Sequence, residues 1–576
     1  MMHPPLPAAE WSASVNAILA NAVHLHQAGQ LQEAIDRYTV ALASGADFAE
    51  IHYNIGLAYK QQGCLDAAAT SLEECLRRNP RNSDAHNNLG NVRKEQGRLD
   101  DAVACYRTAV AQNPNHKQAL GNLGGTLRQQ GHLQDAGAWL CQAVKAQPDR
   151  AELFHELGLA LHGLGNYEQA IGCYRFALGI KPDYPEAAYN LGLALQSSDQ
   201  VDESVACYRQ VIQIQPDFAD AYKNLGAALR QQGFLDDAIA NLQYGVRLQP
   251  EDPDLHLNLA MGLLARGDMA AGWQEFEWRW KTPQLAGARR EFSQPQWYGE
   301  PGVGRTLLIH AEQGFGDTLQ FCRYAALAAA RGLNVVMQVQ PPLVRLLRSL
   351  AGATSIIGYG DAVPDFDVHC PMLSLPLALG TKLETIPSAV PYLHADAAQA
   401  EPLRLRLAEI SGPGLRVGLV WSGNPRSHAP ACAAVDRRRS MAADRLAPLL
   451  ATPGVLFFSL QKDGPPAPAS SHMLHLMHEM TDFADTAALV ANLDLVISVD
   501  TAVAHLAAAL GKPVWLLDRF DPCWRWLTGR RDSPWYPALR LYRQPRAGDW
   551  DSVVAEVARD LRELVDATRQ GNRVAR

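Results

Sequence analysis

A 34-residue motif recurs six times without a gap between residues 56 and 250, and this periodicity constrains the fold more than any other feature of the sequence. One position is always glycine: Gly56, Gly90, Gly124, Gly158, Gly192 and Gly226. A second position always holds a small residue: Ala68, Ala102, Ala136, Ala170, Ser204 and Ala238. A third is always proline: Pro80, Pro114, Pro148, Pro182, Pro216 and Pro250. Small residues let two helices pack closely and proline ends a helix, so each unit predicts a helix pair.

This spacing and pattern resemble the tetratricopeptide repeat. A degenerate first unit is recognisable from residue 15, after an N-terminal tail at 1–14, and a partial last unit begins near 253. Terminal units commonly deviate because they cap the stack. We therefore expect an α-solenoid of about seven units over 15–282, a right-handed superhelix whose concave wall is lined by the first helix of each pair.

An amide column is predicted on that inner wall. The residue two positions before each repeat glycine is asparagine in all units but one, which has Glu156, and the partial last unit has asparagine at the same position: Asn54, Asn88, Asn122, Asn190, Asn224 and Asn258. Amides at regular intervals suit the backbone of an extended peptide. The repeats resemble those of eukaryotic O-GlcNAc transferase, which implies that this column binds a protein substrate. The alternative is that asparagine is simply frequent at this position of the repeat.

Composition excludes several other classes of protein. The 576-residue chain is too long for one core, and its net charge of -8 argues against a general nucleic-acid binder. No apolar run reaches a membrane span, and the N-terminus lacks the pattern of a signal peptide. The ten cysteines are scattered without a CxxC pair, and Cys105, Cys173 and Cys207 share one repeat position, which favours small buried side chains. We expect a cytoplasmic protein without an integral membrane segment.

Beyond residue 282 the period disappears. A connector at 283–299 precedes alternating strands and helices, with an amphipathic helix and tail at 549–576. The expected strands are 305–310, 334–339, 354–359, 366–370, 416–421, 455–460, 494–499, 513–517 and 539–543. Apolar strands separated by helices predict parallel sheets covered on both faces. We expect two Rossmann-like α/β domains, at 300–400 and 401–548, facing a cleft.

The strongest motif of the second sheet is DLVISVDTAVAHLAAALGKPVWLL at 494–517. A buried strand is predicted to end at Asp500, and a helix to start with Thr501, Ala502 and Val503. Helix N-termini at the carboxyl ends of such strands offer free N–H groups to phosphate. His505 lies one helical turn beyond Thr501 and is expected on the same side.

Residues 500–513 resemble the motif of the family 9 glycosyltransferases, the group of heptosyltransferases, and the resemblance extends over roughly 300–545. It implies the GT-B fold, with the nucleotide sugar bound mostly by the second domain. It also implies that Asp317, in a cleft turn with Gly314 and Gly316, is the catalytic base. The alternative for Asp317 is a helix cap, and Glu312 is the reserve candidate for the base.

Further donor contacts are implied by the same resemblance. The nucleotide-sugar-binding candidates are Ser422, Gly423 and Asn424, then Arg439 and Ser440, then Gln461 and Lys462. Asp482 and Phe483 are expected to line the nucleotide base. The basic run at 437–439 also fits a solvated helix start or a membrane-surface patch. The aromatic cluster at 521–537 could stack on a sugar or base, but packing between the two domains is favoured.

Two short motifs are discounted. The DFD sequence at 365–367 has a metal-binding form but is expected away from the diphosphate, and GFG at 314–316 lacks the third glycine of a dinucleotide fingerprint. We therefore expect a metal-independent reaction with no cofactor besides the nucleotide sugar as co-substrate.

Together these features predict an inverting glycosyltransferase that modifies a protein acceptor bound by the repeats. Two alternatives remain open at this point. One is an enzyme with a saccharide or lipid acceptor, and the other is an interaction scaffold with an inactive transferase domain.

Overall fold

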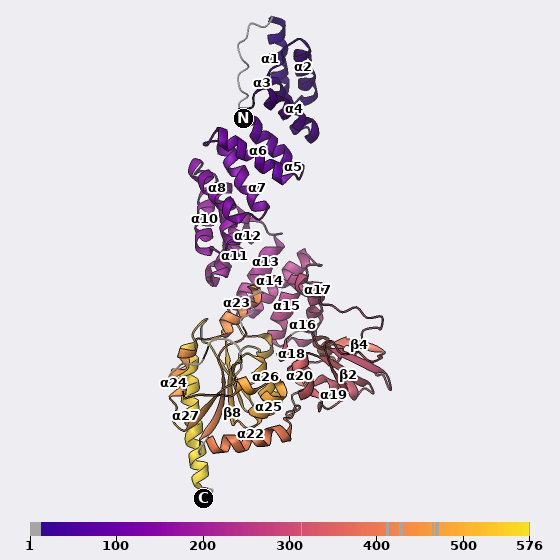
Figure 1. Ribbon diagram of the computed structural model, residues 1–576, viewed down its shortest axis with the longest axis vertical. Coiled ribbons are helices and arrows are strands. Elements are labelled where there is room, and N and C mark those ends of the chain that lie inside the picture. The colour runs from indigo at the N-terminus through magenta and orange to yellow at the C-terminus, as the bar shows by residue number, and fades with distance from the viewer. Residues whose placement is uncertain are drawn as a thin grey trace. The chain divides into compact units, whose positions relative to one another are not determined.

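The computed structural model describes residues 13–312, 314–410, 414–424, 430–462, 466 and 472–574 (Figure 1). Most of the expected tail, residues 1–12, lies outside the described residues. The chain forms two compact units, Met1–Ala221 and Tyr222–Arg576. The last repeats therefore belong to the same unit as the sheets.

The first unit is a stack of helix pairs, as the periodicity predicts (Figure 1). Its helices are α1 (Ala13–Gln27), α2 (Leu31–Ala43), α3 (Ala49–Gln61), α4 (Leu65–Arg78), α5 (Ser83–Glu95), α6 (Leu99–Gln112), α7 (Lys117–Gln129), α8 (Leu133–Ala146), α9 (Ala151–Gly163), α10 (Tyr167–Ile180), α11 (Pro185–Ser197) and α12 (Val201–Ile214). Each second helix stops just before the repeat proline, and the small residue of each pair is fully buried.

The repeat glycines are needed because a large side chain of the partner helix lies against each of them. A Cβ atom on Gly158 would lie 2.5 Å from Cε1 of Tyr174, whose side chain is fully buried. The same relation joins further pairs: Gly56 with Leu72, Gly90 with Tyr106, Gly124 with Leu140, Gly192 with Tyr208 and Gly226 with Leu242. The prediction that glycine permits close packing of the two helices is confirmed.

This contact gives a stability test within one repeat. We expect Gly158→Ala to destabilise the protein by about 1–3 kcal/mol, because the added methyl group overpacks the buried Tyr174 ring. Gly172→Ala in α10 is the matched control. A Cβ atom added there would contact no other part of the protein within 4 Å, and alanine should stabilise the helix by up to about 1 kcal/mol. Melting followed by circular dichroism compares the two, and equal shifts would contradict the packing argument.

The second unit begins with the end of the repeat array. Its helical elements before the sheets are most of α13 (Ala219–Gln231), α14 (Leu235–Leu248), α15 (Pro253–Arg266), α16 (Met269–Phe276), the 3-10 helix η1 (Glu277–Lys281) and α17 (Pro283–Ala286). Trp273 and Phe276 are buried in the same hydrophobic core as both sheets. The last repeats are thus structural parts of the α/β unit.

The first sheet is parallel, with strand order β3-β2-β1-β4. Its strands are β1 (Thr306–His310), β2 (Asn334–Val339), β3 (Ala353–Gly358) and β4 (Val368–Pro371). Its other elements are α18 (Phe315–Phe321), α19 (Tyr324–Ala329), α20 (Pro341–Leu347), η2 (Met372–Ser374), α21 (Leu375–Ala378) and η3 (Leu383–Thr385). The helical segment after the β1 turn is divided between α18 and α19.

The second sheet is also parallel, with strand order β10-β9-β8-β5-β6-β7. Its strands are β5 (Leu415–Val420), β6 (Val455–Ser459), β7 (Leu474–His475), β8 (Leu495–Val499), β9 (Val514–Asp518) and β10 (Leu539–Arg543). Its other elements are α22 (Ala397–Ile410), α23 (Pro430–Arg439), η4 (Ala443–Leu446), α24 (Ala447–Leu450), η5 (Met477–Glu479), α25 (Phe483–Ala491), α26 (Ala502–Ala509), η6 (Trp524–Trp526) and α27 (Trp550–Val574). Two parallel sheets covered by helices are consistent with Rossmann-like α/β architecture.

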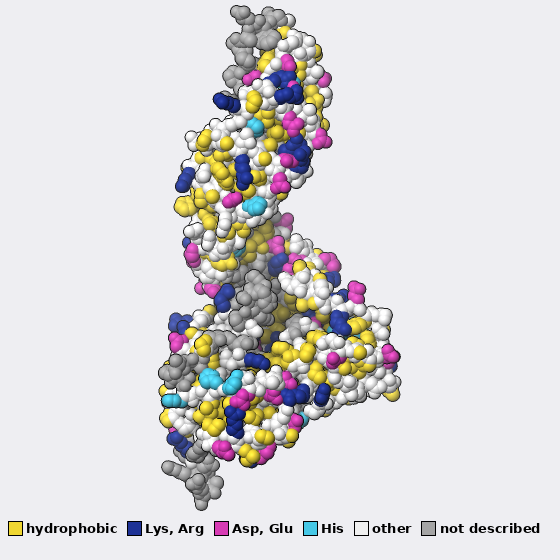
Figure 2. All heavy atoms as spheres, viewed as in Figure 1, with side chains coloured by type: hydrophobic (Ala, Val, Ile, Leu, Met, Phe, Trp, Pro, Cys, Tyr) yellow, Lys and Arg dark blue, Asp and Glu magenta, His cyan; other side chains and the backbone are white. Residues whose placement is uncertain are grey.

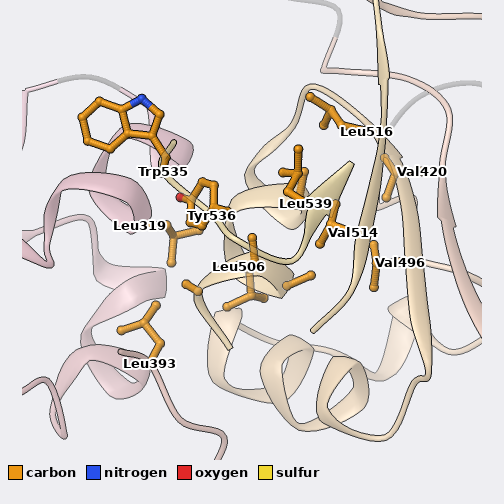
Figure 3. Close-up of a cluster of buried hydrophobic side chains, with 14 of the residues drawn as sticks. Leu319, Leu393, Val420, Val496, Leu506, Val514, Leu516, Trp535, Tyr536 and Leu539 are labelled. Carbon is orange, nitrogen blue, oxygen red and sulfur yellow. The ribbon is translucent and has the colours of Figure 1, made fainter. Parts of the chain in front are cut away.

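Side chains of both sheets share one apolar core (Figure 3). Leu319 of α18 lies beside Tyr536, which is in the segment before β10, and Trp535 and Leu506 of α26 belong to the same cluster (Figure 3). Figure 2 shows positive and negative side chains mixed over the visible face of the repeats. None of the described helices combines the length and apolarity needed to cross a bilayer.

Candidate functional site

The strand order of the second sheet has a topological switch point between β5 and β8. From β5 the chain moves outward to β6 and β7, then returns to β8 on the opposite side of β5. The loops that follow β5 and β8 therefore leave in opposite directions, and ligands of such sheets bind between them. Both loops carry predicted donor-binding residues, at 422–424 and 500–503.

The loop after β5 is held by a compact polar network. The Ser440 hydroxyl accepts a hydrogen bond from the Gly423 N–H at 3.0 Å. Gln461, which follows β6, accepts from the Ser422 N–H at 3.1 Å and donates to the Ser422 carbonyl at 3.0 Å. The structure thus brings together four predicted residues, and each orders the backbone of the loop rather than pointing away from it.

Arg439 joins this loop to the loop after β8. Its Nη1 donates to the Asp500 carbonyl at 2.8 Å, and Nη2 lies 2.5 Å from Asp436. Gly423 is needed here, because a Cβ atom at this position would lie 2.6 Å from Arg439 Nε. The predicted basic residue therefore bridges the loops that follow β5 and β8.

The start of α26 has free backbone donors. Thr501 is the N-cap residue, but its side chain makes no capping bond and instead contacts the Ser498 hydroxyl at 3.0 Å. Within the described part of the chain, no acceptor is recorded for the N–H groups of Ala502 and Val503. All three residues are half-buried, so this helix start can bind an anion.

His505 anchors the first turn of α26 in the core. It is buried, its Nδ1 lies 3.0 Å from the Tyr536 hydroxyl, and its ring stacks on Trp526. Burial lowers the pKa of His505 to about 3, against the nearby Asp500, so the imidazole is neutral. His505 therefore packs the site and does not supply a positive charge.

Asp317 lies on α18, across from α26. A Cβ atom on Gly316 would lie 3.1 Å from the His505 ring and 3.7 Å from Ala502 Cα, so the two helix starts touch. One carboxylate oxygen of Asp317 accepts from the Gly314 N–H at 3.1 Å, and the other forms an ion pair with Arg525. The side chain retains 19% exposure. Asp317 thus caps the helix, as one interpretation predicts, while its second oxygen faces the other sheet.

Glu312 is not available as the reserve base. It forms a bidentate pair with the fully buried Arg279, at 3.0 and 3.1 Å, and accepts from the Leu373 N–H at 2.8 Å. Burial opposes the charge on Arg279, but Glu312 and Glu277 outweigh it and raise the pKa of the guanidinium. This candidate was wrong because the turn after β1 places Glu312 against the end of the repeats.

The remaining predicted donor residues lie at the edge of the site or between the sheets. Asn424 and Lys462 are exposed. Asp482 is the N-cap of α25 and binds Arg345 of α20, while Phe483 packs against Phe315. The two weakest donor candidates therefore join the sheets.

The aromatic cluster at 521–537 packs the two sheets together, as favoured from the sequence. Trp524 contacts Trp273 of the repeats and Phe321 of α18. Arg323, between α18 and α19, donates to the Trp535 carbonyl at 2.8 Å and lies over the Tyr536 ring. The cluster is thus a junction rather than an open stacking surface.

Sequence reasoning missed the two arginines that bind the acids of the β1 turn. Arg279 and Arg525 each lie within a Trp-Arg-Trp sequence in a 3-10 helix, at 278–280 and 524–526. The first pairs with Glu312 and the second with Asp317. The repeated tripeptide was the available signal, although only the fold assigns its partners.

The amide column of the repeats is used between neighbouring units. Asn88 donates to the Tyr53 hydroxyl at 2.8 Å, and Asn122 donates to Asn87 at 2.9 Å. Asn190 lies 2.9 Å from His155 Nε2, again 35 residues away. Asn54 and Asn88 are buried, whereas Asn122, Asn190, Asn224 and Asn258 are half-buried. Peptide binding by this column stays a prediction, and the amides also tie successive inner helices together.

Glu156, the exception in the column, has a local explanation. It pairs with Arg128 of the preceding unit at 2.7 Å. The discounted DFD sequence lies at the opposite end of the first sheet, where Asp367 accepts from the Thr306 N–H at 2.7 Å.

The fold defines a helical repeat protein joined to a Rossmann-like α/β unit with two parallel sheets. Tetratricopeptide repeat models match residues 53–102, 87–151 and 223–277, and a further TPR model matches 24–63, 161–199 and 197–233. The model of glycosyltransferase family 9 (heptosyltransferase) matches residues 470–517, from before β7 to within β9. The chain therefore carries tetratricopeptide repeats, followed by a short segment that matches the glycosyltransferase family 9 model.

Individual proteins show similarity over part of the chain. Protein FlbA of Caulobacter vibrioides is 28% identical over 332 residues, which cover 52% of this chain and 54% of the relative. The crystal structure of MamA is 26% identical, with 29% of this chain and 92% of that chain covered and a TM-score of 0.28. The C-terminal part of a TPR repeat-containing protein from Cytophaga hutchinsonii is 17% identical, with 42% and 99% covered and a TM-score of 0.37. These TM-scores are low, and neither likeness extends to function.

Proposed function

We propose that this protein is a glycosyltransferase of GT-B architecture that transfers a sugar from a nucleotide-sugar donor to a protein acceptor bound by its repeats. The observation that carries the proposal is the meeting of two helix starts. The turn with Asp317 packs against the start of α26, beside the loop held by Arg439. The family 9 match over the α26 segment supports the same assignment.

The chemistry follows from these groups. An acceptor hydroxyl attacks the anomeric carbon, Asp317 takes its proton, and the bond from that carbon to the diphosphate breaks with inversion. The N–H groups of Ala502 and Val503 and the Arg439 guanidinium would stabilise the departing diphosphate. Because these donors supply the positive potential, the proposed reaction is metal-independent.

A protein acceptor is supported by the repeats themselves. Tetratricopeptide repeats are protein-binding modules, and their inner helices here carry amides and charged residues along much of the chain. A saccharide or lipid acceptor would leave the repeats with a recruiting role only.

A two-stage experiment tests the proposal. The full chain is melted with UDP-, ADP-, GDP- and CMP-sugars, and one donor class is expected to raise the melting temperature. Radioactive donor of that class is then incubated with a cell extract. Counts in a protein band support the proposal, counts in the lipid or glycan fraction support the alternative acceptor, and the absence of any donor shift would favour an inactive scaffold.

A further inference from the structure

A cluster of arginines next to the candidate site carries more positive charge than its neighbours balance. Arg438, at the end of α23, and Arg519, directly after β9, share the single carboxylate of Asp521. The distances are 3.3 Å from Arg438 Nε to Oδ2 and 3.5 Å from Arg519 Nε to Oδ1. Two guanidinium groups therefore depend on one buried acid.

Arg230 adds a third positive charge from the repeats. It lies on the inner helix α13, at the repeat position that holds Lys60, Lys94 and Arg128 in earlier units. Burial lowers the pKa of Arg230, and the neighbouring Arg519 and Arg438 act in the same direction against Asp521. Arg230 has no recorded ion pair within the described residues.

Several nitrogens of this cluster are buried without a hydrogen bond. They are Arg230 Nε, Arg438 Nε and Arg519 Nη1, together with Arg439 Nε of the neighbouring loop. The contact of Arg438 with Asp521 is short enough for an ion pair but is not aligned as a hydrogen bond. A buried cationic donor without an acceptor is costly, so a cluster of them indicates a missing anion.

We propose that Arg230, Arg438 and Arg519 form a binding site for a phosphate-type anion, completed by a residue of the repeats. Three guanidinium groups around one carboxylate leave an excess of two positive charges, which matches a phosphate dianion. Arginine is suited to this ligand because its planar donors fit phosphate oxygens in pairs. The phosphate belongs either to the donor's diphosphate or to a phosphorylated group on the acceptor. This site does not depend on sugar transfer, since it predicts anion binding by the protein alone.

The first test uses sodium pyrophosphate and the full chain. We expect Arg230→Gln to weaken pyrophosphate binding about tenfold or more in calorimetry, because a charged donor is lost. The same substitution should raise the melting temperature of the ligand-free protein, since it removes a poorly compensated buried charge. Lys94→Gln, at the same repeat position in α5, should change neither quantity.

A second variant separates binding from folding. Asp521→Asn removes the acid shared by Arg438 and Arg519, so the ligand-free protein should melt at a lower temperature. Pyrophosphate should bind this variant more tightly and restore its melting temperature. A purely structural cluster predicts otherwise: Arg230→Gln would lower the ligand-free melting temperature, and neither variant would change pyrophosphate affinity. That result would overturn the proposal.

Competition distinguishes the two sources of phosphate. If pyrophosphate is displaced by UDP, ADP or GDP and Arg230→Gln weakens the nucleotide as well, the site binds the donor. If pyrophosphate binds together with the nucleotide, and a phosphoserine peptide displaces it, the site binds the acceptor. Pyrophosphate binding that neither ligand displaces, with no effect of Arg230→Gln, would again exclude the site.

Discussion

Asp317→Asn is expected to reduce sugar transfer by about 10²–10⁴-fold, because an amide cannot take the proton of the acceptor hydroxyl. Helix α18 should keep its start, since the Asn oxygen can still accept from the Gly314 N–H. Donor binding should therefore be retained, because the groups proposed to bind the diphosphate lie in the second sheet. The measurements are initial rates of transfer and the donor-induced melting shift of each protein.

The control for this experiment lies on the same sheet. Asp367→Asn changes a carboxylate at the opposite end of β1, where it accepts only from the backbone N–H of Thr306. We expect its transfer rate to stay within about twofold of wild type once melting shows that it is folded. Undiminished transfer by Asp317→Asn would remove Asp317 from the mechanism, while an equal loss in both variants would point to the stability of the sheet.

The second large effect is expected for Arg279→Met, which should destabilise the protein by about 3–5 kcal/mol. Arg279 is fully buried and bonds to Glu312, Glu277 and the Ser374 hydroxyl. Its removal would leave buried Glu312 without a counter-charge. Removing one member of a buried ion pair costs more stability than replacing both members with apolar residues. Urea unfolding of the full chain measures the change.

Two further variants define that result. Lys281→Met lies in the same 3-10 helix but is exposed and pairs with the exposed Glu251, so its effect should stay below about 1 kcal/mol. The double variant Arg279→Met with Glu312→Gln should recover part of the loss, because it removes the unpaired carboxylate. Equal stability of Arg279→Met and Lys281→Met would show that the buried Arg279–Glu312 ion pair does not stabilise the protein.

The fold was largely predictable because its signals are periodic. The glycine and proline positions predicted the helix pairs, and the apolar runs predicted β2 and β10 with their observed ends. The short β7 was missed, since two residues carry no periodicity. The division at residue 221/222 was not predictable either, because it depends on Trp273 and Phe276 joining a core formed much later in the chain.

The site was predictable only where its residues are local in sequence. The motif at 500–505 and the turn at 314–317 could be recognised, and the structure brings them into contact. Pairing could not be recognised: nothing near Asp317 indicates that Arg525, 208 residues away, would bind it. The failure of Glu312 as a candidate base has the same origin, because Arg279 is distant in sequence and adjacent only in the fold.

The burial of the last repeat helices in the core of the sheets has an evolutionary consequence. Helix pairs upstream of α13 can be gained or lost by duplication, because each unit contacts mainly its neighbours. Helices α15 and α16 cannot be exchanged so freely, since the loss of α16 would remove Trp273 and Phe276 and uncover Phe321 and Trp524, which pack against Trp273. The length of the repeat array can therefore change without disturbing the sheets, while its final helices must be kept together with them.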